Sequence, residues 1–349
     1  MGTLLAAVGG WARATTRVTW SLPEEGQTGA MTMPAFGVLL PRDLPADQVL
    51  TYARRVDELG FDELWVVEDL GFRGGVAQTA AVLAATSRVH VGIGILPAAV
   101  RNVAFAAMEA ATLAQLFPGR VTIGIGHGMP GWMRSAGCWP QQPLTFLGAY
   151  TEALRTLLRG GAVTDEYLGL TDVALEPSSV PDVVPDVLLG VRGPRSLGVA
   201  GRVADGTILA EPTTPQYVSA ALSQIAAPGA HRVVAYGVAA VDDDESAALA
   251  AARAGLVWVG EPDWAPHHIG LPFAQDIQRL RASCATREEF AAALPDEWVA
   301  TLALAGTPEQ VRARAAALGE AGAASIGLTP VGPDPLAELE RLARVLRAG

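Results

Sequence analysis

Residues that could do chemistry on a bound molecule stand where apolar runs of the sequence end. Glu68 and Asp69 close one such run, "FDELWVVED", residues 61–69. Because neighbouring residues of a strand point to opposite sides, we expect only one of the two carboxylates to face a site. It could serve as a general acid or base, or as a hydrogen-bond partner of a ring. Equally, the pair could begin a loop and form ion pairs with Arg42 or Arg73.

Glycines alternate along two other apolar segments, "GIGIL" at 92–96 and "GIGHGMPGWM" at 124–133. Glycine inside a strand often marks the close approach of a ligand or of another backbone. Two such strands side by side would form a smooth wall for a planar ring, with His127 at its edge between two glycines. Tight packing inside the fold is the alternative. The residues alone leave both interpretations open.

A third run, residues 187–191, stops at Arg192, Gly193 and Pro194, and a helical pattern follows at once. Backbone N–H groups at a helix N-terminus bind phosphate without any lysine. Arg192 or Arg195 could add a charge-assisted contact. A plain turn between a strand and a helix is the alternative. The end of the next strand presents Ala210 and Glu211.

The elements that must position these residues alternate along the whole chain. Apolar runs predict strands, and amphipathic segments between them predict helices. The strands are expected at 36–40, 61–69, 89–96, 120–126, 187–191, 207–210, 232–241 and 324–332. The helices are expected at 45–60, 76–86, 102–117, 144–160, after Gly193, at 215–226, from near Asp244, at 307–322 and at 334–348.

This alternation predicts an α/β fold, a single (β/α)₈ TIM barrel with an insertion near residues 256–300. In such a barrel the C-terminal ends of the strands form the active site, which would bring the residues above together. A doubly wound open sheet is the alternative, but no G-x-G-x-x-G follows the first strand. Within the insertion, the neighbouring His267 and His268 have no spacing that suits one metal on a helix. We interpret them as part of a surface loop.

Composition excludes several classes of function. The 349 residues carry a net charge of −11, which argues against nucleic acid or an anionic membrane as the main partner. No apolar run approaches the ~20 residues of a transmembrane helix. All 25 basic residues are arginine, so Schiff-base and lysine general-base chemistry are excluded. Cys138 and Cys284 have no ligand-like spacing, which predicts the reducing cytoplasm and no metal site.

The first residues differ from the rest of the chain. Residues 1–33 have a short apolar stretch but neither a basic start nor a clear cleavage site, so a signal peptide is disfavoured. We interpret them as an N-terminal extension, disordered or added by an overlong start. Residues 34–349 are then expected to form one domain.

Four segments carry a resemblance to a known family: "GFDELWVVED", "RVTIGIGHG", "LLGVRGPRSLGVAGRVADGTILAEPTTPQYV" and "GTPEQVRARAAALGEAGAASIGLTPVGPDPL". They are similar to segments of the bacterial-luciferase-like family, in particular its coenzyme F420-dependent oxidoreductases. The resemblance runs from about residue 36 to the C-terminus. It implies a TIM barrel with an insertion, a homodimer, and FMN or F420 bound with its ring at the strand ends.

The resemblance also implies roles for individual residues. Gly94 and Ile95 fall where F420-dependent members have a non-prolyl cis peptide bond behind the ring. The remaining cofactor-binding positions are the phosphate turn and the neighbouring strand ends: Arg192, Gly193, Pro194, Arg195, Gly126, Gly128 and Ala210. Glu68 and Asp69 stand where relatives often carry Asp-His. Met129 stands where members that oxidise sugar phosphates carry a catalytic glutamate, which argues against glucose 6-phosphate as substrate.

Together these features predict an F420-dependent oxidoreductase that moves a hydride between C5 of the deazaflavin and a small organic substrate. Glu68 or Asp69 would give or take the proton, and His127 would orient the ring or the substrate. Trp258, Trp264 and His267 of the insertion are expected to shape the pocket. One alternative is an FMN-dependent, luciferase-type monooxygenase with a flavin reductase partner. Another is a flavin- or deazaflavin-binding protein without turnover.

Overall fold

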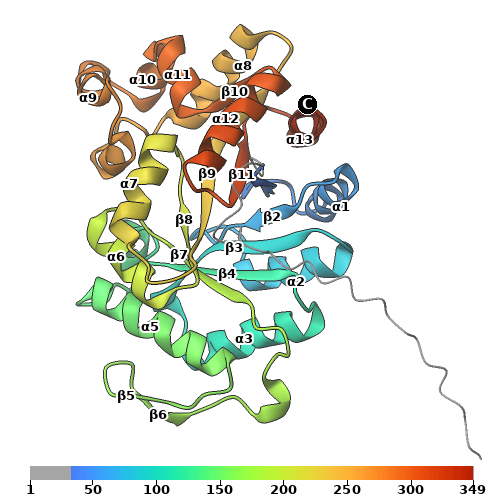
Figure 1. Cartoon of the computed structure of the whole chain (residues 1–349), viewed down its shortest axis with the longest axis vertical. Helices are drawn as coiled ribbons and strands as arrows, with labels where there is room; N and C mark the ends of the chain where they lie inside the picture. The colour runs from blue at the N-terminus through green and yellow to red at the C-terminus, as the bar shows by residue number, and fades with distance from the viewer. Residues whose placement is uncertain (1–32, 349) are drawn as a thin grey trace, which may run out of the picture.

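A computed structural model describes residues 33–348 and shows a closed barrel of eight parallel strands (Figure 1). Each strand pairs in parallel with the next, and β11 pairs with β1 to close the ring. The prediction of a TIM barrel is therefore confirmed. In order around the ring, the strands are β1 (Ala35–Leu39), β2 (Glu63–Val66), β3 (His90–Pro97), β4 (Val121–Gly126), β7 (Asp186–Gly190), β8 (Gly206–Leu209), β9 (Arg232–Val241) and β11 (Ser325–Pro330).

Helices surround this barrel. Several begin where a polar side chain accepts a hydrogen bond from the first turn, as Asn102, Thr214 and Asp334 do. Thr307 forms a full capping box with Gln310. The main helices outside the insertion are α1 (Val49–Leu59), α2 (Gly75–Ala85), α3 (Val103–Leu116), α5 (Pro143–Leu158), α6 (Pro194–Val203), α7 (Pro215–Ile225), α8 (Glu245–Ala252), α12 (Pro308–Glu320) and α13 (Pro335–Ala343).

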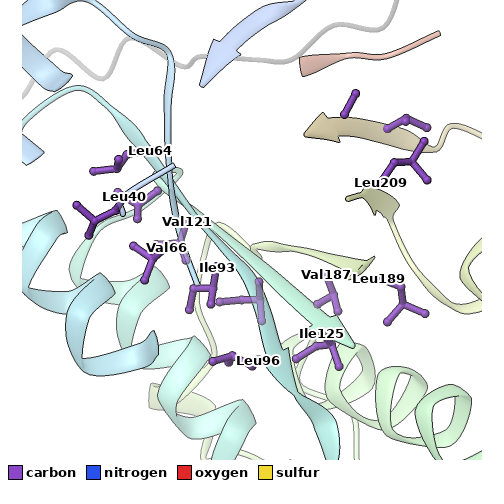
Figure 2. Close-up of a cluster of buried hydrophobic side chains, with 14 of the residues drawn as sticks. Leu40, Leu64, Val66, Ile93, Leu96, Val121, Ile125, Val187, Leu189 and Leu209 are labelled. Carbon is purple, nitrogen blue, oxygen red and sulfur yellow. The ribbon is translucent and has the colours of Figure 1, made fainter. Parts of the chain in front are cut away.

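Two apolar layers hold the barrel together, because side chains alternate between the two faces of a strand. Leu64 and Val66 of β2 join the larger cluster, which fills the space between the strands and the helices (Figure 2). Trp65 points the other way and packs inside the ring with Tyr236, their ring centroids 5.6 Å apart. The interior is thus filled by side chains up to the level at which the strands end.

The segment after β9 is the expected insertion, but it is more regular than expected. It holds short 3₁₀ turns at Arg253–Leu256 (η3) and Pro262–His268 (η4), then α9 (Ala274–Ser283), α10 (Arg287–Ala293) and α11 (Asp296–Leu302). A short strand, β10 (Leu304–Gly306), then pairs with the end of β9. Figure 1 shows α9, α10 and α11 gathered at one end of the molecule.

The interpretation of His267 and His268 as surface-loop residues is wrong. Both are buried, with 0% and 3% of their surface exposed. Nδ1 of His267 donates to the carbonyl of Pro212 at 3.0 Å, and its ring lies 4.5 Å from that of Tyr217. Two histidines in a segment rich in Pro and Trp look like a loop in sequence. Here η4 folds back onto the barrel, and the histidines fill that contact.

Several short elements had no counterpart in the sequence-based expectation. They are α4 (Pro130–Ser135), the antiparallel hairpin of β5 (Val163–Asp165) and β6 (Leu170–Val173), and 3₁₀ turns at Ala98–Val100, Pro177–Ser179 and Arg344–Leu346. Most of the predicted extension, residues 1–32, lies outside the described residues. Over residues 33–348, none of the helices has the length and apolar character needed to cross a membrane.

Candidate active site

A cavity of about 720 Å³ opens where the strands end. Nine of the twelve predicted site residues line it, brought together from β2, β3, β4, β7 and β8 and the turns that follow them. These nine are Glu68, Asp69, Gly94, Ile95, His127, Gly128, Arg192, Arg195 and Ala210. Within residues 33–348, no group of three or more His, Cys, Asp or Glu side chains is placed to hold a metal ion.

The other three predicted residues lie beside this cavity and not in its wall. Gly126 is the last residue of β4, packed against Ile95 and the carbonyl of Gly190. Gly193 is the N-cap of α6, with a φ of +82° that favours glycine. Pro194 is the first residue of α6 and faces a separate hollow near Tyr217.

One wall of the cavity is bare backbone. The Gly94–Ile95 peptide bond is cis, so the non-prolyl cis bond that the resemblance implies is confirmed. The pairing of β3 with β4 shifts register at this point, between Ile93 and Leu96. A Cβ on Gly94 would overlap the Tyr236 hydroxyl, and one on Gly190 would overlap Cγ2 of Ile95. These two positions therefore require glycine, and both face the cavity.

The other strand glycines serve a different purpose. A Cβ on Gly92 would overlap the ring of Trp65, and one on Gly124 would overlap the carbonyl of Ile93. Both positions lie below the cavity, inside the packed barrel. Tight packing inside the fold thus accounts for these glycines, and the approach of a planar ring to Gly94 and Gly190 stays a prediction.

The two acids after β2 are each held by an arginine. Glu68 forms a two-pronged ion pair with Arg101, at 2.6 and 2.7 Å, and accepts the N–H of Gly75 at the start of α2. Asp69 pairs with the exposed Arg42 at 2.6 Å. The predicted Arg42 partner is thus confirmed for Asp69. Glu68 thus bonds both to Arg101 and to the first residue of α2.

His127 lies at the edge of the cavity, as expected. Its ring is half-buried and lies 6.4 Å from that of Trp139, centroid to centroid. Burial lowers the pKa of this imidazole below its ordinary value, so it is neutral at pH 7. A neutral imidazole has one ring nitrogen that donates and one that accepts, and can orient a polar group on a ring.

The first turn of α6 also borders the cavity. No side chain caps the N-terminus of α6, so the N–H groups of its first turn remain available. Arg195 and Ser196 of that turn line the cavity. Arg192 is engaged elsewhere, since its guanidinium stacks 4.5 Å over the ring of Trp264. A ring at the glycine wall and a phosphate at α6 would fit these residues.

Among the cavity residues outside the predicted set, three carry a polar or aromatic side chain that matters for the site: Glu211, Trp139 and Tyr236. Glu211 directly follows Ala210, and its place at a strand end was visible in the sequence. Trp139 lies in an irregular segment, and Tyr236 lies in the middle of β9. Sequence reasoning from strand ends had no means of finding these two.

Comparison with known proteins places the chain in a family. The profile of the luciferase-like monooxygenases matches residues 16–325. The chain belongs to the luciferase-like monooxygenase family. A 5,10-methylenetetrahydromethanopterin reductase from Methanolobus tindarius is 29% identical over 318 residues, 86% of this chain and 95% of that protein. An F420-dependent glucose-6-phosphate dehydrogenase from Microbacterium testaceum is 29% identical over 184 residues, 49% of this chain and 54% of that protein.

Solved structures of luciferase-like proteins share the fold. The coenzyme F420-dependent tetrahydromethanopterin reductase of Methanopyrus kandleri matches with a TM-score of 0.75 at 20% identity, over 90% of this chain and 99% of that one. An F420-dependent secondary alcohol dehydrogenase, solved with an F420–acetone adduct, matches with a TM-score of 0.70 at 19% identity, over 90% and 98%. The predicted family and fold are both confirmed.

Proposed function

We propose that this luciferase-like protein is an F420-dependent oxidoreductase that transfers a hydride between C5 of the deazaflavin and a small organic substrate. The observation that carries this proposal is one cavity lined by two kinds of feature. They are the glycine wall with its cis Gly94–Ile95 bond and the uncapped N-terminus of α6 with Arg195. A molecule with a planar ring and a phosphate matches both features.

The chain's own residues would bind and orient, while the bound cofactor supplies the hydride chemistry. The ring would lie against the cavity wall that Gly94, Ile95 and Gly190 line. Arg195 and the N–H groups of α6 would hold the phosphate. His127, neutral at pH 7, would orient a polar atom at the ring edge.

FMN also combines a ring with a phosphate, so the cavity alone does not separate the two cofactors. The names of the relatives favour F420, because an F420-dependent dehydrogenase is 29% identical to this chain over 184 residues. The FMN-dependent monooxygenase, which would need a flavin reductase partner, is the second candidate. This second candidate is supported by structures of monooxygenases with the same fold, one of them solved with FMN.

The cavity lining is also rich in tryptophan. Trp132, Trp139 and Trp264 line it together with Met129. This lining favours a planar or largely apolar organic molecule over a sugar phosphate. The relatives supply a panel of probes to test this: 5,10-methylenetetrahydromethanopterin, propan-2-ol and glucose 6-phosphate.

A binding titration tests the cofactor. Purified protein is titrated with F420 and, separately, with FMN, and quenching of tryptophan fluorescence is followed. Tighter binding of F420 supports the proposal, and the probe panel is then assayed with oxidised and reduced F420. Preference for FMN would favour the monooxygenase, with oxygen consumption as the next assay. Failure to bind either molecule would leave the α6 turn as a plain barrel turn.

We also propose that the protein acts as a homodimer in the cytoplasm. Helix α3 carries large exposed side chains on one face, Phe105, Met108 and Leu116, with exposed fractions of 65%, 52% and 67%. Positions 105, 108, 112 and 116 recur at helical spacing. A second copy of this chain would cover them. The two cysteines, Cys138 and Cys284, are unpaired, which suits a reducing compartment.

A further inference from the structure

Besides Glu68 and Asp69, a partly buried carboxylate, that of Glu211, lines the cavity from the loop after β8. The insertion holds this loop at two points. Nε1 of Trp264 donates to the carbonyl of Glu211 at 3.2 Å, and Nδ1 of His267 donates to the next carbonyl, that of Pro212, at 3.0 Å. The hydroxyl of Thr213 donates back to the carbonyl of Ala210 at 3.1 Å. The backbone that carries Glu211 is thus fixed on both sides.

Four carboxylates line the cavity, and one of them, Asp263, is exposed to solvent. Of the three that are partly buried, Glu211 is the one without an arginine partner. Glu68 is paired with Arg101, and Asp69 with Arg42. Among the described residues, no arginine nitrogen lies within 4.0 Å of the Glu211 carboxylate oxygens. Glu68 and Asp69 are therefore committed to ion pairs, whereas Glu211 is free to bind a proton or a ligand atom.

The groups around Glu211 set its affinity for a proton. Burial raises its pKa above the ordinary glutamate value, and its own backbone N–H opposes this. The positive charge of Arg192 also lowers it, Asp69 raises it, and Arg42 lowers it slightly. From the other elements packed here, Tyr236 of β9 and His267 of η4 are both uncharged, because burial raises the pKa of the first and lowers that of the second.

We propose that Glu211 is the acid–base residue of this site, exchanging a proton with the substrate heteroatom whose carbon gains or loses the hydride. This inference rests on the proposed function. It gives the proton-transfer role to Glu211 in place of Glu68 or Asp69. It also defines the substrate class as a carbonyl or imine in one direction, and as the corresponding alcohol or amine in the other.

The step balances as follows. In reduction, a hydride from the reduced cofactor forms a C–H bond at the substrate carbon, and the π electrons of C=O or C=N move to the heteroatom. The Glu211 carboxylic acid gives that heteroatom its proton and becomes a carboxylate. The bound cofactor would supply the two electrons of that hydride, and its remaining ring proton would pass to solvent. In oxidation each transfer runs in reverse, with the carboxylate as base.

Infrared spectroscopy tests the proton without any substrate. The C=O stretch of a protonated carboxyl is followed from pH 4 to pH 8 in the wild type, in Glu211→Gln and in Glu320→Gln, an exposed glutamate as matched control. We expect the wild type and E320Q to share a carboxyl signal that remains protonated above the ordinary glutamate pKa of about 4.3, and E211Q to lack that component. Identical titrations of all three proteins would overturn the inference.

Kinetics then separates this inference from the proposed function. With F420 and whichever probe of the panel turns over, E211Q should lose about 10²–10⁴-fold in kcat, while its Kd for F420 changes by less than about 3-fold. Glu211→Asp should retain part of the activity with a shifted pH profile. F420 binding together with an unchanged kcat in E211Q overturns the inference alone. Failure of the wild type to bind F420 overturns the proposed function and the inference with it.

Discussion

Two arginines follow β7, Arg192 and Arg195, and they make different contacts. Arg192 stacks on Trp264 and reaches the carbonyl of Asp263 at 3.4 Å, so it ties the insertion to the barrel. Arg195 lines the cavity beside the uncapped N-terminus of α6. In the proposed function, this guanidinium is the one that would contact the phosphate of the cofactor.

Replacement of Arg195 should therefore weaken cofactor binding without unfolding the protein. A charge-assisted hydrogen bond contributes about 1.5–3 kcal/mol, so Arg195→Gln should raise the Kd for F420 by about 10- to 100-fold. Fluorescence titration measures this. The matched control is Arg202→Gln near the end of the same helix, where the Kd should not change. Equal effects of the two substitutions would show that only the overall charge of the helix matters.

Glu68 offers the opposite case, a residue whose effect should be on stability. Its carboxylate accepts hydrogen bonds from Arg101 and from the first turn of α2, and its side chain is only 13% exposed. Glu68→Gln should lower the free energy of unfolding by about 1–3 kcal/mol, because the Arg101 charge loses its partner. Urea denaturation measures the change. If Glu68→Gln instead left stability unchanged and abolished the acid limb of the pH–activity profile, the result would support Glu68 as the proton-transfer residue.

For single residues, the sequence predicted which side chains lie at the cavity better than it predicted their ion-pair partners. Strand ends identified Glu68, Asp69 and His127 as cavity residues, because parallel strands end at the same edge of a barrel. The partner of Glu68 is 33 residues away in sequence, and nothing local indicates it. Glu211 shows the same limit, since its significance lies in having no ion-pair partner.

Among the elements, β3 and β7 together make the bare wall of the site. Ile95 packs where a side chain on Gly190 would lie, so the two positions are coupled. Gly190→Ala should displace Ile95 and lower stability by about 1–3 kcal/mol, with weaker F420 binding. The double variant Gly190→Ala/Ile95→Ala should recover much of that stability. Gly131→Ala, where no atom lies within 4 Å, is the control and should change little in thermal unfolding.

The η4 turn of the insertion should make stability depend on pH. Burial lowers the pKa of His267 to about 3, with a smaller contribution from the charge of Arg192, while the unfolded chain has a histidine pKa of about 6.5. Between these values the unfolded state binds more protons, so stability is full above about pH 6.5 and falls as the pH decreases. His267→Gln should remove up to about 2 kcal/mol of the loss between pH 7.5 and pH 5, as measured by urea denaturation.

The same urea denaturation experiment could contradict this role of His267. If His267→Gln and the wild type lose stability in parallel over this range, His267 does not control the acid sensitivity.

Among the helices and strands, the long amphipathic helices and the apolar strands were predictable from the periodicity of the sequence. The insertion and the β5–β6 hairpin were not, because short elements owe their form to what they pack against.

For the whole molecule, the closed ring followed from regular alternation of strands and helices, since a parallel strand needs a helical crossover. What the alternation could not supply is how the insertion folds over one rim, or which outer face is left uncovered. The α3 face is such a feature. Its exposed residues follow the helical period, yet in sequence they resemble any buried face.

The α3 face leads to the last prediction, on assembly. If a second copy covers Phe105, Met108 and Leu116, the protein should sediment as a dimer, and Met108→Glu should shift it toward monomer, because a charge would be buried without a partner. The matched control is Ile269→Glu, an exposed apolar residue on the insertion, which should leave the dimer intact. Analytical ultracentrifugation over a range of concentrations decides this. A wild-type monomer at every concentration would show that the α3 face serves another partner.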